Sequence, residues 1–161
     1  MSGAVHVICA TVAFGMGIDK SCVRVVAHWS PPLSLANYSQ ESGRAGRDGK
    51  RAFARIYYSV NDRDMIMSQI MKEKTRSDIS DNFKRVVMYC EGTECRHLVL
   101  GDYFGDDCEI CDGNCDSCCQ KDALKTKLKI FFSGQDRECA IFRNANVQLR
   151  KVYKSKFMKR N

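Results

Sequence analysis

Gln40-Glu-Ser-Gly-Arg-Ala-Gly-Arg47 is the stretch of this 161-residue sequence that decides its fold. It places Gln40, Arg44 and Arg47 at spacings of four and three, with glycines between them. Side chains at i, i+4 and i+7 of a helix share one face, and glycines allow that face to pack closely. We expect the two guanidinium groups to converge on a surface suited to a triphosphate between two lobes. An isolated Arg-x-x-Arg is usually a solvated pair, so the neighbouring segments must show whether these arginines form a binding surface.

Short β-branched runs lie on both sides of this stretch. Val5-His-Val-Ile-Cys-Ala10 and Val23-Arg-Val-Val-Ala-His28 predict two strands of a buried parallel sheet, and Phe53-Ala-Arg-Ile-Tyr-Tyr58 predicts a third. Ser34 is expected to begin a short helix that gives way at Gly43. The order of strand, helix and strand predicts an α/β fold.

Helical patterns follow the third strand. Apolar residues recur at helical spacing over 61–74 and, after an N-cap at Ser80, up to Tyr89. A third helix is expected from Thr93 to Tyr103, ended by a glycine two residues later. One more helix is expected beyond residue 120, and no clear pattern continues past Ser133.

Composition and charge limit the classes of protein. A hydrophobic content of 44% is typical of a folded chain, and no apolar run approaches the roughly 20 residues of a membrane span. The net charge of +7 is uneven, because residues 121–161 hold 12 Lys/Arg against 3 Asp/Glu, whereas residues 1–120 hold 14 against 16. A basic tail favours a polyanion partner, most simply nucleic acid, although a merely solvated tail would look the same.

The loop Ala10-Thr-Val-Ala-Phe-Gly-Met-Gly-Ile-Asp-Lys20 contains a Gly-x-Gly turn that ends at Gly17. Glycines allow the backbone to approach a ligand closely. Asp19 is placed to accept a hydrogen bond from a ribose hydroxyl, and Thr11 to bind a nucleic-acid phosphate. Such turns are common, so a simple tight exit from a strand is the alternative.

Six of the ten cysteines lie between Cys95 and Cys119, which favours a metal site over disulfides. Four thiolates fit tetrahedral zinc. Cys115 and Cys118 form a C-x2-C pair, while Cys111 and the helix-borne Cys95 supply the remaining ligands.

Two alternatives to this ligand set remain open. Cys108-x2-Cys111 is itself a possible pair, so Cys108 is an alternative ligand, and His97 is another one turn from Cys95. The remaining four cysteines are expected to be small buried hydrophobic residues: Cys9, Cys22, Cys90 and Cys139.

Together these segments resemble RecQ-type DNA helicases. Ala10–Lys20 and Gln40–Gly49 resemble helicase motifs V and VI, and His28-Trp29 and Tyr57-Tyr58-Ser-x-x-Asp62 extend the resemblance. The cysteine cluster after Tyr103-Phe-Gly is similar to the zinc module of these helicases. Its Cys111-x3-Cys115-x2-Cys118 spacing resembles the fifth animal paralogue most.

The resemblance implies roles for individual residues. Arg47 is then the arginine finger, and Arg44 and Gln40 approach the nucleotide phosphates. Nucleotide contacts are implied for Asp19, Gly17 and Gly43, DNA contact for Thr11, and structural zinc ligation for Cys95, Cys111, Cys115 and Cys118.

The resemblance also implies a division of the chain. We expect a partial RecA-like helicase C-terminal lobe over 1–62, a mainly helical zinc-binding module over 63–120 and a basic extension over 121–161. No Gly-x-x-x-x-Gly-Lys-Ser/Thr loop or acidic magnesium motif occurs in the sequence, so ATP and Mg²⁺ require a further RecA-like lobe, in cis or in trans.

The implied function is ATP-dependent 3'-5' unwinding of DNA in nuclear repair, recombination or replication. Its partners would be single-stranded DNA and duplex junctions, with no membrane, and the chain alone would be inactive. The alternative is a non-catalytic, zinc-dependent module that binds DNA or protein.

Overall fold

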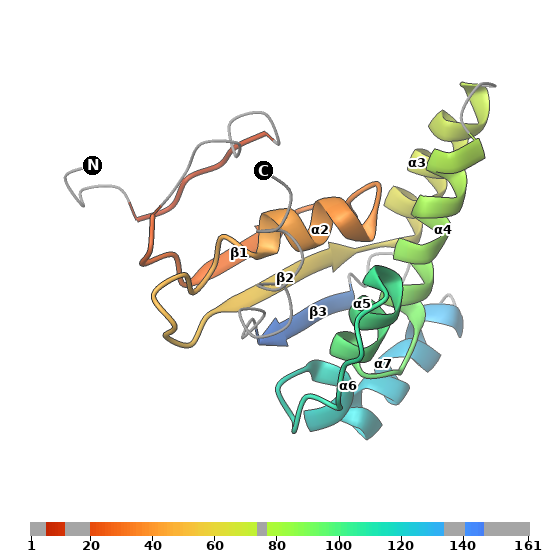
Figure 1. Cartoon of the computed structure of the whole chain (residues 1–161). Coiled ribbons are helices and arrows are strands. Elements are labelled where there is room, and N and C mark those ends of the chain that lie inside the picture. Colours follow the sequence, from red (N-terminus) through yellow and green to blue (C-terminus); the bar gives the residue numbers. More distant parts are fainter. Residues whose placement is uncertain (1–5, 12–19, 74–76, 134–140, 147–161) are drawn as a thin grey trace.

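The computed structural model describes residues 6–11, 20–73, 77–133 and 141–146 (Figure 1). Its elements are, in chain order, β1 (Val25–His28), α2 (Leu35–Ser42), β2 (Phe53–Tyr58), α3 (Val60–Lys72), α4 (Ser77–Glu91), α5 (Arg96–Phe104), α6 (Asp116–Cys119), α7 (Lys121–Ser133) and β3 (Ile141–Asn146). Figure 1 shows the three strands side by side, with α2 alongside them. None of the helices in these ranges is long and apolar enough to cross a bilayer.

The sheet combines parallel and antiparallel pairing in the order β1-β2-β3. β1 pairs with β2 in parallel, with Val25 opposite Phe53, which confirms the predicted parallel pairing. The predicted burial is wrong for β1, whose residues are exposed or half-buried in the described sheet, because it lies at the edge of that sheet. β3 pairs with β2 in the antiparallel direction, with Asn146 opposite Phe53. No strand was expected after Ser133, because the sequence Ile141-Phe-Arg-Asn-Ala-Asn146 lacks the apolar alternation that identifies one.

The first expected strand is not formed over residues 6–10, which have no regular structure and are exposed. The prediction of a buried strand there is wrong for the described residues. Strand propensity depends on packing against neighbouring strands, and β1 has no neighbour other than β2 in the described sheet. Cys9 and Cys22 are likewise exposed, so they are not the buried hydrophobic residues that we expected, whereas Cys90 is buried as predicted. Cys139 lies outside the described residues.

Two helix ends confirm the sequence-based expectations. The Ser34 hydroxyl accepts a hydrogen bond from the Asn37 N–H at 3.1 Å and caps α2, and Gly43 ends that helix. Gly105 ends α5 in the left-handed conformation with φ 68°, which favours glycine.

Two helix beginnings differ from the expectations. α4 begins at Ser77, so Ser80 lies inside the helix and does not cap it. Ile79 is the one apolar residue before Phe83, where the buried apolar face begins, so the pattern alone placed the helix start too late. α5 begins at Arg96, three residues after the expected start at Thr93.

One apolar core joins the sheet to the helices. Its buried side chains come from β2, α2, α4, α5 and α7: Leu35, Tyr38, Ala54, Ile56, Tyr58, Phe83, Val86, Tyr89, Cys90, Leu100, Leu124, Leu128 and Phe131. The helix expected beyond residue 120 is α7, and it contributes side chains to this core. The helix that precedes the arginine loop, α2, and the helix that follows Cys95, α5, both contribute side chains to this core.

Candidate functional site

The loop after α2 carries both arginines of the Gln40–Arg47 stretch. The helix ends at Ser42, and Gly46 adopts the left-handed conformation with φ 67°. The prediction that Gln40, Arg44 and Arg47 share one helix face is therefore wrong. Only Gln40 lies on the helix, while both arginines lie in the turns that follow.

Backbone hydrogen bonds fix the shape of this loop. The Arg44 N–H donates to the Glu41 carbonyl at 3.2 Å, and the Ala45 N–H donates to the Ser42 carbonyl at 3.0 Å. The Gly46 N–H donates to the Val23 carbonyl at 3.0 Å, which ties the loop to the segment before β1. Gly46 is buried and has a positive φ that other residues rarely adopt, so glycine is favoured at this position.

An ion pair holds the far end of the loop. Arg24 Nη2 lies 2.7 Å from Asp48 Oδ1, and Arg24 Nη1 donates to the Arg51 carbonyl at 3.1 Å. The same Asp48 oxygen accepts from the Lys50 N–H at 3.1 Å. The hydrogen bond from Arg24 lowers the pKa of Asp48 below its usual value. Arg24 therefore positions the loop between Gly46 and Arg51, a role that its place in a β-branched run did not indicate.

The residues predicted to contact nucleotide or DNA differ in burial, and the structure describes only some of them. Arg44 and Arg47 are partly buried, whereas Gln40 and Gly43 are exposed at the end of α2. Thr11 is exposed in a stretch without regular structure, which brings it to no ligand site. Gly17 and Asp19 lie outside the described residues.

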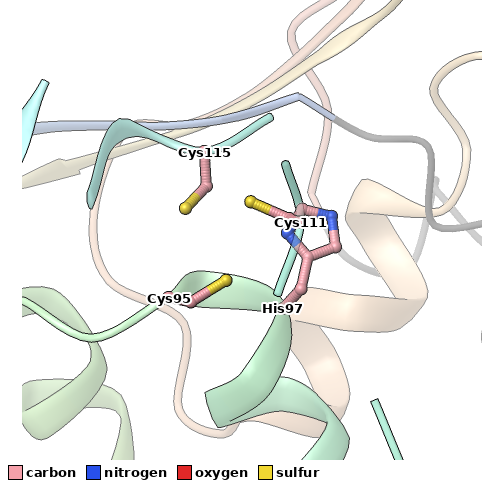
Figure 2. Close-up of side chains that lie close together, drawn as sticks. All are labelled: Cys95, His97, Cys111 and Cys115. Atoms are coloured by element: carbon pink, nitrogen blue, oxygen red, sulfur yellow. The ribbon is translucent and has the colours of Figure 1, made fainter. Parts of the chain in front are cut away.

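A second cluster gathers cysteines around the start of α5 (Figure 2). The Sγ atoms of Cys95, Cys111 and Cys115 and one ring nitrogen of His97 all lie within 4.8 Å of one another. Tetrahedral zinc with ligands at about 2.0–2.3 Å needs donor separations of roughly 3.3–3.8 Å. The donor set and its spacing therefore fit zinc with small movements of the side chains.

Cys118 and Cys108 occupy different positions relative to this cluster. Cys118, a predicted ligand, is not among the donors that lie within 4.8 Å of one another, although the neighbouring thiols affect its pKa. The Cys108 thiol instead packs on α5, where a Cβ added at Gly101 would lie 2.4 Å from its Sγ atom. Gly101 thus leaves space for Cys108 against the helix, and Cys108 is not among the donors that lie within 4.8 Å of one another.

The thiols of the cluster differ in how readily they ionise, because the pKa of Cys95 is lowered whereas those of Cys111 and Cys118 are raised. Burial opposes ionisation of Cys95, but hydrogen bonds from the backbone of Leu98, Cys111 and His97 lower its pKa to about 7. Burial and the thiols of Cys115 and Cys95 raise the pKa of Cys118 to about 11. Since thiolates are the metal-binding form, Cys95 is the first of these two to be available near neutral pH.

A buried ion pair lies directly behind the cluster. Arg96 follows Cys95, Asp116 follows Cys115, and Arg96 Nε donates to Asp116 Oδ1 at 2.9 Å. Arg96 is 1% exposed and Asp116 is 8% exposed. Sequence patterns do not indicate this pair, because the partners are 20 residues apart and only their adjacency to cysteines distinguishes them.

Comparison with known families separates the chain into two matched parts. Residues 1–49 match the helicase conserved C-terminal domain, and residues 60–119 match the RecQ zinc-binding domain. The α/β unit and the cysteine cluster thus define a helicase C-terminal lobe followed by a zinc-binding module, and the cofactor of that module is structural zinc. The chain belongs to the RecQ family of DNA helicases.

Curated relatives agree with this family. The chain is 46% identical over 139 residues to "ATP-dependent DNA helicase Q5" of Rattus norvegicus, covering 80% of this chain and 14% of the relative. It is 43% identical over 135 residues to "RecQ-like DNA helicase BLM" of Xenopus laevis, covering 76% and 10%. It is 41% identical over 122 residues to "ATP-dependent helicase SGS1" of Saccharomyces cerevisiae, covering 71% and 8%. The chain therefore spans a small part of the length of these relatives.

Proposed function

We propose that this chain supplies the arginine finger and the zinc module of an ATP-dependent 3'-5' DNA helicase. Arg47 would neutralise charge that develops on the transferred phosphoryl group, and Arg44 and Gln40 would approach the nucleotide phosphates. The observation that carries the proposal is the loop itself, which is held between Gly46 and the Arg24–Asp48 ion pair. A rigid loop favours catalysis by arginine because the charge is positioned before the reaction.

The nucleotide would be bound by a further RecA-like lobe, in cis or in trans. Residues 1–161 contain no Gly-x-x-x-x-Gly-Lys-Ser/Thr loop, which in such motors holds the β- and γ-phosphates. When present, ATP and Mg²⁺ supply the hydrolysis that drives unwinding. Gly17, Asp19 and Gly43 would lie near the nucleotide, and the chain alone would not hydrolyse ATP. As part of such a helicase, it would act on DNA in nuclear repair, recombination or replication.

We propose Cys95, Cys111, Cys115 and Cys118 as the zinc ligands, with His97 as an outer-sphere partner. Cys118 is supported by its C-x2-C spacing from Cys115 and by the effects of the three other thiols on its pKa. His97 Nδ1 is buried and has no hydrogen-bond partner among the described residues, so it suits an N–H donor to a thiolate of the loaded site.

Cobalt substitution distinguishes the two candidates for the fourth ligand. Cys118→Ser is expected to shift the visible absorption of the Co²⁺-loaded protein and to lower zinc affinity more than about 100-fold, the upper end for outer-sphere changes. His97→Gln is expected to leave the four-thiolate spectrum in place and to cost about tenfold in affinity. The reverse pattern in a competition titration would make His97 the ligand.

We further propose that single-stranded DNA and duplex junctions are the partners, with Thr11 near the strand and the basic tail on the phosphates. Affinity for duplex DNA should fall by roughly 40-fold between 50 and 200 mM salt if three phosphates are contacted. Lys154→Gln, in the basic tail, is expected to lower the slope of log K against log salt by about 0.9. Lys84→Gln, an exposed residue of α4 paired with Asp81, serves as the control and should leave the slope unchanged. Anisotropy titrations measure both slopes, and salt-independent binding would favour an apolar protein partner instead.

A further inference from the structure

Arg96 connects the cysteine cluster to the end of α4. Besides the bond to Asp116, its Nη2 donates to the Gly92 carbonyl at 3.0 Å and its Nη1 donates to the Tyr89 carbonyl. The guanidinium carbon lies 5.2 Å from the centre of the Tyr89 ring. The planar guanidinium group thus contacts both the zinc-binding loop and the helix, a geometry that a lysine cannot reproduce.

Aromatic contacts continue from Tyr89 to the strand beside the arginine loop. The rings of Tyr89 and Tyr38 are 5.5 Å apart, and those of Tyr38 and His28 are 5.2 Å apart. Burial raises the pKa of Tyr38 well above its usual value, against the opposing effect of a hydrogen bond with Tyr89. His28 Nε2 lies 2.6 Å from Glu41 Oε2.

The last of these contacts reaches the loop. The Glu41 carbonyl accepts the N–H of Arg44 at 3.2 Å, so the residue that pairs with His28 also holds the first arginine of the loop. We call the side chains between the cluster and this point the buried network: Asp116, Arg96, Tyr89, Tyr38 and His28.

The burial of the network indicates that it holds neighbouring segments in position more than it adds net stability. Arg96, Tyr89 and Tyr38 are each 1% exposed. A buried ion pair contributes little net stability, because desolvation offsets the attraction between its charges, yet breaking it is costly. Densely packed interiors also transmit displacements, since they have few voids to absorb them. Movement of Asp116 should therefore reach Tyr38 through contacts that have no room to relax.

We propose that the buried network couples metal occupancy of the cysteine cluster to the conformation of loop 43–49, with Arg96 and Tyr38 as positioning residues. Zinc links the short segment of Cys111 and Cys115 to α5 and so holds Asp116 against Arg96. Without zinc this segment opens, Arg96 loses its partner, and α2 with its loop loses support through Tyr89 and Tyr38. The importance of this coupling rests on the proposed function of Arg44 and Arg47, but the coupling itself requires no nucleotide.

Amide hydrogen exchange of the full chain tests the coupling directly. Exchange is measured for peptides that cover residues 35–49, 53–58 and 90–120, with zinc bound and after chelation. We expect chelation to accelerate exchange over 35–49 about fivefold or more, the lower end of couplings between distant sites. Residues 53–58 in β2 are expected to remain protected.

The Arg96→Lys variant distinguishes coupling through the buried network from a general loss of stability. Lysine keeps a positive charge beside Asp116 but loses the bonds to Tyr89 and Gly92, so the rates over 35–49 with and without zinc are expected to coincide. Arg85→Lys is the matched control, because Arg85 also lies over an aromatic ring, that of Tyr103 at 5.6 Å, but is exposed and outside the network. It should retain the full effect of zinc.

Three outcomes would overturn the proposal. The first is a wild-type protein in which chelation opens 90–120 and leaves 35–49 unchanged. The second is equal loss of protection over 53–58, which would indicate general unfolding. The third is a full zinc effect in Arg96→Lys or, should that variant not bind zinc, in Tyr38→Phe, which keeps the ring and removes the hydroxyl group. Because exchange is measured without ATP, an inactive arginine finger would leave these results unaltered.

Discussion

Removing zinc is expected to unfold the cysteine-rich part of residues 90–120, which follows Gly105. Between Gly105 and Cys119, the buried side chains are Cys115, Asp116 and Ser117, so this segment buries little apolar surface of its own. Structural zinc contributes an apparent free energy of about 10–16 kcal/mol in small zinc domains, and here that energy replaces a hydrophobic core. Chelation should therefore expose the segment to limited proteolysis and lower the helical circular dichroism.

A ligand variant should have the same effect as chelation. Cys115→Ser is expected to abolish stoichiometric zinc binding and to make residues 90–120 sensitive to protease. Cys119→Ser is the matched control, since Cys119 is the exposed neighbour of Cys118 and should retain one zinc per chain. Full protease resistance of the chelated protein or of Cys115→Ser would show that the metal does not hold this segment together.

Arg47→Ala is expected to lower DNA-stimulated ATP hydrolysis by about 10³ to 10⁵, the contribution of an arginine finger. The measurement requires a form of the protein that includes a phosphate-binding lobe, and it compares kcat rather than KM, because the charge acts on the transition state. Arg47→Lys should restore only part of the rate, since lysine lacks the planar donor pair.

Arg51→Ala controls for loss of positive charge near the same loop. The Arg51 side chain lies over the Phe53 ring at 5.3 Å, outside the segment proposed to contact phosphate. Its kcat should remain close to that of the wild type. Equal losses in Arg47→Ala and Arg51→Ala would indicate a general effect of charge rather than an arginine finger.

Local patterns predicted a substantial part of the fold. The β-branched runs identified β1 and β2 and their parallel pairing, and Ser34 and Gly105 marked helix ends correctly. The strands and helix ends depend on residues close in sequence, and the helix between the two strands indicated their parallel pairing. The cysteine spacing likewise indicated a zinc module, because short C-x2-C separations restrict where two sulfur atoms can lie.

Features that depend on distant residues could not be predicted in the same way. Whether residues 6–10 form a strand depends on a neighbouring strand, and the arginine loop depends on Gly46 and on the Arg24–Asp48 ion pair, whose partners are 24 residues apart. Helical periodicity therefore placed Arg44 and Arg47 on a helix that ends at Ser42. The bond between Arg96 and Asp116 spans 20 residues and has no periodic pattern that would identify it.

The central claim is that loop 43–49 acts on a nucleotide that another RecA-like lobe holds. The most direct test measures DNA-stimulated ATP hydrolysis by the purified 161-residue chain, by a lobe that carries the phosphate loop and acidic motif, and by the two together, joined or mixed. We predict no detectable turnover by the chain alone, DNA-stimulated turnover by the combination, and loss of that turnover in Arg47→Ala. Robust hydrolysis by the chain alone, or turnover of the combination that survives loss of Arg47, would contradict the claim.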